Sequence, residues 1–275
     1  MTAFYVLSGG LADERRSERI FRGDLLIFKD VPALADLCAL VDSLIPSALA
    51  ELAASVDDVQ RRFLADSRTE QCLRTALEQV GVDTTATCWD RFHLRVQLPS
   101  SDPERAEAGT LGVHRDTWSS NVYQQVNWWT PLRPITAERT IALYPAYWGT
   151  PLANTSARWD LDEIRVRRNA GIPDVPLVPE PSEPVDVSAE VRVVIEPGDL
   201  LSFSGAHLHA SVPNSTPDAR ISVEVRTVNI DDVKLGRGAP NVDGAAPRVP
   251  IRWFRRMSDG TSLAALIGEA EVGAS

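Results

Sequence analysis

His114 and Asp116 are two residues apart in the segment GVHRDTW, a spacing that suits metal ligands. In an extended backbone, residues i and i+2 point to the same face, so this imidazole and this carboxylate can bind one cation from one side. One more histidine from a neighbouring strand would complete a triad of two histidines and one carboxylate, which leaves three coordination positions open on Fe(II). We expect this third ligand in the segment FSGAHLHASVPN, at His209.

His207 competes with His209 for the third position, because the two side chains share one face of an extended segment. Arg220 follows His209 by eleven residues and His207 by thirteen, and it begins an alternating segment. Its planar guanidinium suits bidentate binding of a carboxylate. Two alternatives without function stay open: Asp116 caps a backbone N–H in a surface turn, or Arg220 is a strand charge that faces solvent.

A further segment, QQVNWWTPL, is typical of a strand with two different faces. Gln125, Asn127 and Trp129 share one face, and Trp128 lies on the other. Polar side chains beside an aromatic ring suit the wall of a cofactor and substrate site, whereas in the alternative the tryptophans only fill the core. The pattern does not decide which face lines a cavity.

The first eighty residues are predicted to be mostly helical. The run DLLIFKD from Asp24 indicates a strand, and apolar residues at helical spacing follow over 32–44 and again over 48–80. Gly81 is a typical position for a helix to end.

After Gly81 the period changes to two, which indicates strands. Residues 91–98 alternate between apolar side chains and a polar face that carries Arg95 and Gln97. Short strands bounded by Pro, Gly or Asn are predicted at 124–132, 140–144, 191–195, 199–203 and 220–228. They indicate a β-barrel or sandwich. Five prolines between 171 and 186 favour a long ordered loop or a lid over a site.

Composition narrows the class of protein. With 275 residues, 44% apolar and 24% charged, the chain fits one elaborated globular domain. The 28 basic against 38 acidic residues give a net charge of −10, which argues against nucleic acid as a partner. Three cysteines without a paired spacing indicate neither a disulfide framework nor a zinc cluster, and no apolar run is long enough for a membrane span or a signal segment. We therefore expect a cytoplasmic protein without a membrane partner.

The motif HRD with Trp118 two residues on, followed by PGDLLSF, LHASVPN and then Arg220, resembles the phytanoyl-CoA dioxygenase-like branch of the Fe(II)/2-oxoglutarate oxygenases. The resemblance covers about residues 90–230. It implies a mainly β fold with N-terminal helices and a double-stranded β-helix core, a jelly roll related to the cupins. The single domain would comprise a mainly helical part (1–82), the β-helix core (88–230) and a C-terminal extension (231–275).

The resemblance also implies roles for individual residues. It places Fe(II) on His114, Asp116 and His209, because the eleven-residue interval to Arg220 fits the family. The far carboxylate of 2-oxoglutarate would lie on Arg220. Cofactor contacts are expected at Arg220, Ser211, Gln97, Gln125, Asn127 and Trp129. Substrate contacts are expected at Arg95, His207 and Trp118, with His207 outside the ligand set.

The implied reaction consumes O2 and 2-oxoglutarate, releases succinate and CO2, and oxidises a small-molecule substrate. Hydroxylation is the expected outcome, with desaturation or cyclisation as alternatives, and a role in specialised-metabolite biosynthesis is expected. A halogenase is disfavoured, because halogenation in this superfamily uses a small residue at the position of Asp116. The segment TIALYPAYWGTPLANTS departs from the glycine-rich turn of many relatives, so contacts there are not transferred. A peptide-modifying oxygenase and a non-catalytic cupin-like binding protein remain as alternatives.

Overall fold

Four N-terminal helices cover one face of a large sheet in the computed structural model, which describes residues 2–99, 110–172, 176–247 and 251–268. Pro32 occupies the first turn of its helix, where the lack of an N–H costs nothing. Gly81, with φ of +91°, follows the last of these helices, as the sequence predicts. The four helices are α1 (Asp13–Ile20), α2 (Pro32–Leu44), α3 (Leu49–Ala65) and α4 (Ser67–Gln79).

The large sheet has eight strands in the order β1-β2-β8-β5-β10-β3-β11, and β4 also pairs with β10. Its long central strand, β10, pairs with β5 along one side and with β4 and β3 along the other. The strands are β1 (Phe4–Leu7), β2 (Leu25–Phe28), β3 (Thr87–Trp89), β4 (His93–Gln97), β5 (Gln125–Pro131), β8 (Leu200–Ser204), β10 (Arg220–Asn229) and β11 (Arg255–Arg256). The mainly helical N-terminal part therefore also supplies two strands, β1 and β2, to the core sheet.

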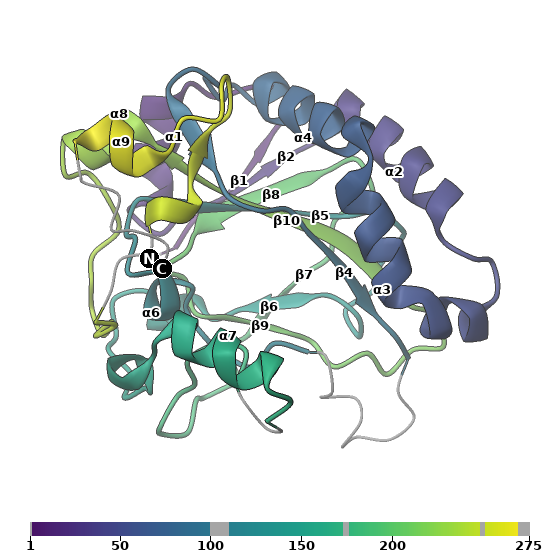
Figure 1. The fold of residues 1–275 in the computed structure, drawn as a ribbon. Coiled ribbons are helices and arrows are strands. Elements are labelled where there is room, and N and C mark those ends of the chain that lie inside the picture. Colours follow the sequence, from purple (N-terminus) through teal and green to yellow (C-terminus); the bar gives the residue numbers. More distant parts are fainter. Residues whose placement is uncertain (1, 100–109, 173–175, 248–250, 269–275) are drawn as a thin grey trace.

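A second sheet of three strands faces the large one. Its order is β7-β6-β9, with β6 (Ile141–Leu143), β7 (Val191–Val193) and β9 (His209–Ser211). Figure 1 shows the small sheet on one side of the large sheet and α2, α3 and α4 on the other. Among the described residues no strand pairing joins the two sheets, so closure into a double-stranded β-helix stays a prediction.

Two apolar clusters fix this layering. One lies between the helices and the outer face of the large sheet, where Leu37 and Phe63 join Trp128 and Val223. The other lies between the sheets and contains Trp129, Phe203 and Leu143. Because side chains alternate along β5, one tryptophan enters each cluster.

The remaining elements are short. They are α6 (Thr117–Ser120), α7 (Leu161–Asn169), α8 (Ile230–Lys234), α9 (Leu263–Ile267) and the 3-10 turns Pro145–Tyr147, Ser156–Arg158 and Ile251–Trp253. Of the proline-rich segment 171–186, residues 173–175 lie outside the described residues, and the rest includes a β-bridge from Pro181 to Asn154. Its role as a lid stays a prediction.

Of the described helices, none is both long and apolar enough by itself to span a membrane; α2 and α3 reach that length only together, across a bend of 112°.

Candidate metal centre

His114, Asp116 and His209 come together as the sequence predicts. One ligand atom from each lies within 4.8 Å of the others, and all three side chains are buried. His114 Nε2 is 3.5 Å from Asp116 Oδ1, and the two imidazole rings are 4.3 Å apart. Two imidazole nitrogens and one carboxylate oxygen, gathered in one place, form a ligand set that fits a divalent first-row metal such as Fe(II).

Backbone pairing brings the two histidines together. His114 and His209 form an antiparallel bridge in which each N–H donates to the other residue's carbonyl at 2.9 Å. The extended conformation expected for the whole motif ends there, because Asp116 has helical angles (φ −61°, ψ −33°) and is the N-cap of α6. The carboxylate therefore reaches His114 by a turn of the backbone and not by strand alternation.

A backbone carbonyl beside Nδ1 orients each of the two imidazoles. His114 Nδ1 lies 2.8 Å from the Gly112 carbonyl, and His209 Nδ1 lies 3.0 Å from the His207 carbonyl. A carbonyl only accepts, so Nδ1 carries the proton and Nε2 keeps its lone pair for a metal. Burial, and next the neighbouring His114, lower the pKa of His209, which keeps it neutral.

Asp116 is held by two amides. Gln125 Nε2 and Asn127 Nδ2 donate to its Oδ2 at 3.0 and 2.5 Å, which leaves Oδ1 beside His114. Burial opposes ionisation, but the neighbouring imidazoles of His114 and His209, and then the charge of Arg226, hold the pKa of Asp116 below its usual range. The face of β5 that carries Gln125 and Asn127 thus points to the metal centre, and both amides contact a ligand.

Arg220 lies on the inner face of β10 without an acidic partner. Its Nη1 donates to the Thr140 carbonyl at 2.6 Å, and Nη2 to Ser211 Oγ at 3.4 Å. Nε is buried without a hydrogen bond, and no carboxylate of the described residues pairs with this guanidinium. Burial, then the charge of Arg95, lower its pKa to about 10. An anionic ligand would supply the counter-charge that this buried cation lacks.

Gln97 lies beside this guanidinium. It is directly opposite Arg220 in the strand register, and its Nε2 donates to the Val212 carbonyl at 3.1 Å. Its Oε1 is buried and accepts no hydrogen bond from a described residue. Arg220 thus has Ser211 and Gln97 as polar neighbours, and the contact of these three side chains with 2-oxoglutarate stays a prediction.

Three other predicted contact residues lie in packed surroundings. His207 Nε2 lies 3.0 Å from the Gly23 carbonyl, its ring packs 4.4 Å from Trp148, and burial lowers its pKa to about 3. It does not join the group of ligands found among the described residues. Trp118 is buried and donates to Asp243 at 2.7 Å. Trp129 lies in the core between the sheets. Contacts of these three side chains with a ligand stay predictions.

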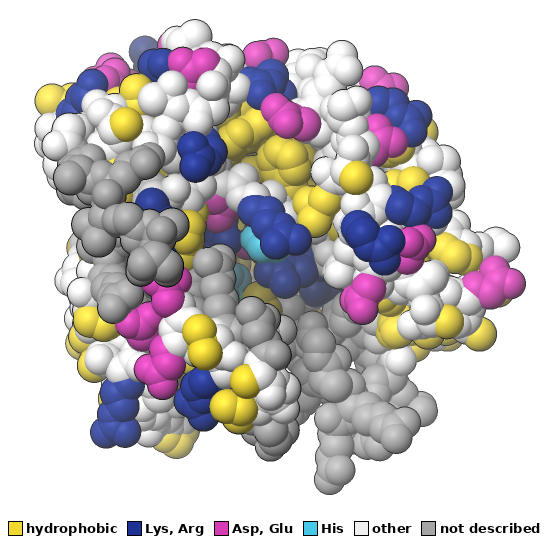
Figure 2. Space-filling view, viewed as in Figure 1, with side chains coloured by type: hydrophobic (Ala, Val, Ile, Leu, Met, Phe, Trp, Pro, Cys, Tyr) yellow, Lys and Arg dark blue, Asp and Glu magenta, His cyan; other side chains and the backbone are white. Residues whose placement is uncertain are grey.

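The inner face of β10 carries further polar and charged side chains beside Arg220. Ser222, Glu224 and Arg226 share the face of Arg220, a period of two that is visible in RISVEVRTV. Arg226 pairs with Asp90 at 2.6 Å. Figure 2 shows this side of the molecule hollowed, with basic, acidic and histidine side chains gathered in the hollow.

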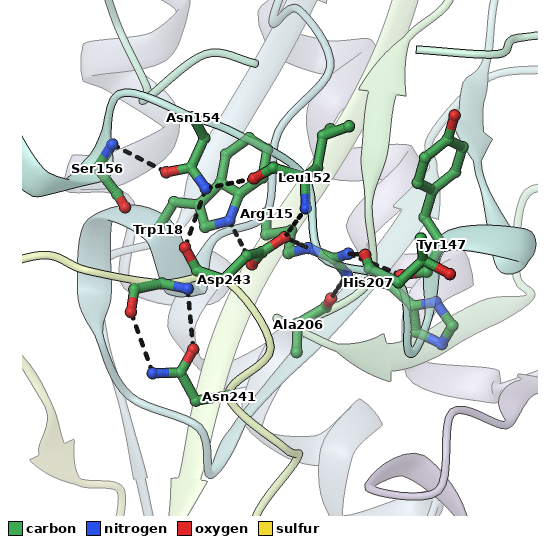
Figure 3. A network of polar contacts seen from close by, with 12 residues as sticks. Arg115, Trp118, Tyr147, Leu152, Asn154, Ser156, Ala206, His207, Asn241 and Asp243 are labelled. Atoms are coloured by element: carbon green, nitrogen blue, oxygen red, sulfur yellow. Dashed lines mark hydrogen bonds and ion pairs between the residues drawn. The ribbon is translucent and has the colours of Figure 1, made fainter. Parts of the chain in front are cut away.

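Arg115, between two of the ligands, anchors their segment (Figure 3). Its guanidinium donates from Nη1 to the Ala206 carbonyl at 2.5 Å and from Nη2 to the carbonyls of Tyr147 and Thr150 at 2.7 and 3.0 Å. Nε donates to Asp243. One buried side chain thus ties three separate loops to the metal-binding segment, and no local sequence signal predicts this.

A scan of protein-family models and a search of the curated proteins find no match to this chain. Solved structures are similar to it. EvdO2 from Micromonospora carbonacea var. aurantiaca, complexed with 2-oxoglutarate, is 16% identical with a TM-score of 0.49, covering 80% of this chain and 92% of that one.

Two further solved structures are similar at lower scores. The epimerase SnoN, in complex with Fe3+, alpha ketoglutarate and nogalamycin RO, is 15% identical with a TM-score of 0.42 and covers 79% and 83% of the two chains. The non-heme monooxygenase ThoJ is 17% identical with a TM-score of 0.44 and covers 73% and 69%. At these values the similarity does not assign an activity, so function depends on the geometry of the site.

Proposed function

We propose that this protein is an Fe(II)- and 2-oxoglutarate-dependent oxygenase that acts on a small molecule, with a double-stranded β-helix as its core. The observation that carries the proposal is the triad of His114, Asp116 and His209 together with a buried Arg220 that has no acidic partner. The triad provides three ligands on one side, and the guanidinium provides a separate anion site. An oxygenase that binds a dicarboxylate next to its metal needs both.

Each residue has a definite task in this reaction. Iron with 2-oxoglutarate supplies the oxidising chemistry through O2, and succinate and CO2 are released. The two imidazoles and the carboxylate of Asp116 bind the metal, while Gln125 and Asn127 fix the orientation of that carboxylate. Arg220 and Ser211 orient the oxoacid by its far carboxylate, so its other end is directed to the metal.

Hydroxylation is the outcome we propose, in the biosynthesis of a specialised metabolite. Asp116 supports it, because a carboxylate occupies the position that halogenation would need open. A halogenase is therefore disfavoured, while desaturation and ring formation would use the same ligands.

The experiment is an anaerobic Fe(II) titration of the metal-free protein, followed by succinate measurement after O2 and 2-oxoglutarate are added. Wild type should bind one Fe(II) per chain and form succinate. His114→Ala, Asp116→Ala and His209→Ala should each lose Fe(II) binding and turnover. His207→Gln is the matched control, because His207 is a buried histidine two residues before His209 and its variant should retain Fe(II) binding. Equal iron in wild type and all three ligand variants would refute the proposal, and iron bound without succinate would indicate a binding protein.

A further inference from the structure

Arg95 and Glu224 face the metal centre as a loosely associated pair. In the register of β4 and β10, Arg95 lies opposite Ser222, the next inward residue before Glu224. In the register of β10 and β5, Arg226 lies opposite Asn127, whose amide binds Asp116. Because residues of one face alternate, Arg95 and Glu224 share the face that carries the metal centre.

The two side chains retain their capacity for hydrogen bonds. Arg95 Nη2 and Glu224 Oε2 are 3.8 Å apart, too far for a hydrogen bond. Neither side chain forms a hydrogen bond with any residue that the structure describes. Their side chains are 36% and 17% exposed, so a ligand can reach both from solvent. Ser222 Oγ is fully buried on the same face and has no hydrogen-bond partner among the described residues.

The neighbouring pair on this face behaves differently. Arg226 contacts Asp90 at 2.6 Å and donates to His93 Nε2 at 3.2 Å, so its Nη2 already has partners. Asp90 is almost fully buried. Arg226 and Asp90 are thus in direct contact, although Arg226 Nε and Asp90 Oδ1 have no hydrogen-bond partner among the described residues, whereas Arg95 and Glu224 are separated and partly exposed.

Charge selects the class of ligand. Each of the two pairs, Arg95 with Glu224 and Arg226 with Asp90, contains one arginine and one carboxylate. This part of the wall therefore carries no net charge. An anionic group would be attracted to Arg95 but repelled by Glu224. A cationic group would be attracted to Glu224 but repelled by Arg95. An uncharged hydroxyl group can donate to the carboxylate and accept from the guanidinium, so it satisfies both at once.

We propose that Glu224 and Arg95 bind an uncharged, hydroxyl-bearing part of the substrate beside the metal. The inference rests on the proposed function, since it places the substrate next to the oxidising centre. Glu224 accepts from the hydroxyl, and Arg95 donates to its oxygen. This pair then determines which substrates bind.

The test uses four small probes that share one ring and differ in charge and donors. They are trans-1,2-cyclohexanediol, 1,2-dimethoxycyclohexane, cyclohexanecarboxylate and cyclohexylammonium. Binding to the whole chain, loaded with redox-inactive Zn(II) and saturating 2-oxoglutarate so that Arg220 is occupied, is measured by ligand-observed NMR. Wild type should bind the diol best, and the dimethoxy compound, which has no donor, should bind about tenfold or more weakly.

Single substitutions should shift the preference in opposite directions. Glu224→Gln should weaken diol binding about tenfold and strengthen binding of the carboxylate probe, because Arg95 loses its counter-charge. Arg95→Gln should strengthen binding of the ammonium probe. Arg133→Gln is the matched control: its side chain is also 36% exposed and pairs with Asp42 on the surface, so all four affinities should stay unchanged.

The double variant Arg95→Gln/Glu224→Gln keeps the net charge of the chain. It also provides a second test if one of the single variants does not fold. It should bind the diol weakly and prefer neither ionic probe. Equal binding of the diol and its dimethyl ether, or no change of ion preference in the single variants, would overturn the inference. Since Zn(II) supports no turnover, diol binding by the pair without succinate formation by the Fe(II) protein would refute the proposed function alone.

Discussion

Arg115 Nε donates a hydrogen bond to Asp243 Oδ2 at 3.1 Å, although the two residues are 128 positions apart. Both side chains are almost fully buried. Asp243 also accepts from Trp118 Nε1 at 2.7 Å and from the Leu152 N–H at 3.1 Å. The C-terminal extension therefore supplies the counter-charge of the residue between two metal ligands.

We expect Asp243→Asn to weaken both the fold and the metal centre. The substitution leaves the buried charge of Arg115 without its carboxylate, and loss of one partner of a buried pair costs about 3–5 kcal/mol. Denaturant unfolding should show this loss, and a Co(II) titration should show weaker metal binding. Asp42→Asn, which removes an exposed ion pair with Arg133, is the control and should change neither measurement. Unchanged unfolding of Asp243→Asn would contradict the interpretation.

Asn127→Leu should reduce metal affinity without removing a ligand. The variant keeps the branched shape of the side chain but loses the donor to Asp116 Oδ2, and loss of such supporting contacts typically costs about 10–100-fold in metal affinity. Fe(II) titration under anaerobic conditions measures the effect. Thr130→Val, a buried substitution on the other face of the same strand, should leave affinity intact. Equal affinities would mean that Gln125 alone orients Asp116.

Arg220→Ala should raise the KM for 2-oxoglutarate far more than it weakens Fe(II) binding. Charge-assisted hydrogen bonds contribute about 1.5–3 kcal/mol, which corresponds to about one to two orders of magnitude in KM. Arg220→Lys keeps the positive charge but lacks the planar guanidinium that binds a carboxylate bidentately, so its KM for 2-oxoglutarate should be intermediate. Succinate formation across 2-oxoglutarate concentrations, at saturating Fe(II), measures both. An unchanged KM would assign the carboxylate to Arg95 or Arg226.

Stability should fall as the pH decreases below about 6.5, in part because of His93. Burial, and next the charges of Arg226 and Arg95, lower the pKa of His93 to about 3. In the unfolded chain its pKa is near 6.5, so between these values only the unfolded state binds the proton. The free energy of unfolding should then fall by up to about 1.4 kcal/mol per pH unit toward acid.

His93→Gln isolates this contribution. Unfolding of wild type and variant is compared between pH 7 and pH 4, and the variant should show the shallower dependence. Asp90, whose pKa burial raises to about 6, acts with the opposite sign and is present in both proteins. Parallel curves would show that His93 does not contribute.

Local sequence predicted the larger elements and the three members of the triad. Apolar spacing over 32–80 predicted the helices, and the period of two predicted β4, β5 and β10. The same alternation predicted that Gln125 and Asn127 share a face. These patterns are reliable because helix and strand periods act over a few residues, and they depend on side chains that are neighbours in the chain.

Strand alternation alone did not separate His207 from His209, since both occupy the same face of one segment. The interval to Arg220 favoured His209, and the tertiary structure confirms this choice. The bridge from His209 to His114 brings one to the metal centre, while the Gly23 carbonyl holds the other away. Likewise, strand period alone gave no preference between the two faces of β5; helices cover one and the second sheet faces the other.

The contacts of Arg115 with Asp243 and the pairing of Arg226 with Asp90 also depend on packing. They join residues more than a hundred positions apart, and such contacts form only when the sheets and loops come together. The sequence therefore determined which residues carry chemistry, and the packing of the two sheets determined which of them meet. The physical reason is that local periodicity sets the direction of a side chain, whereas its partner is set by the fold.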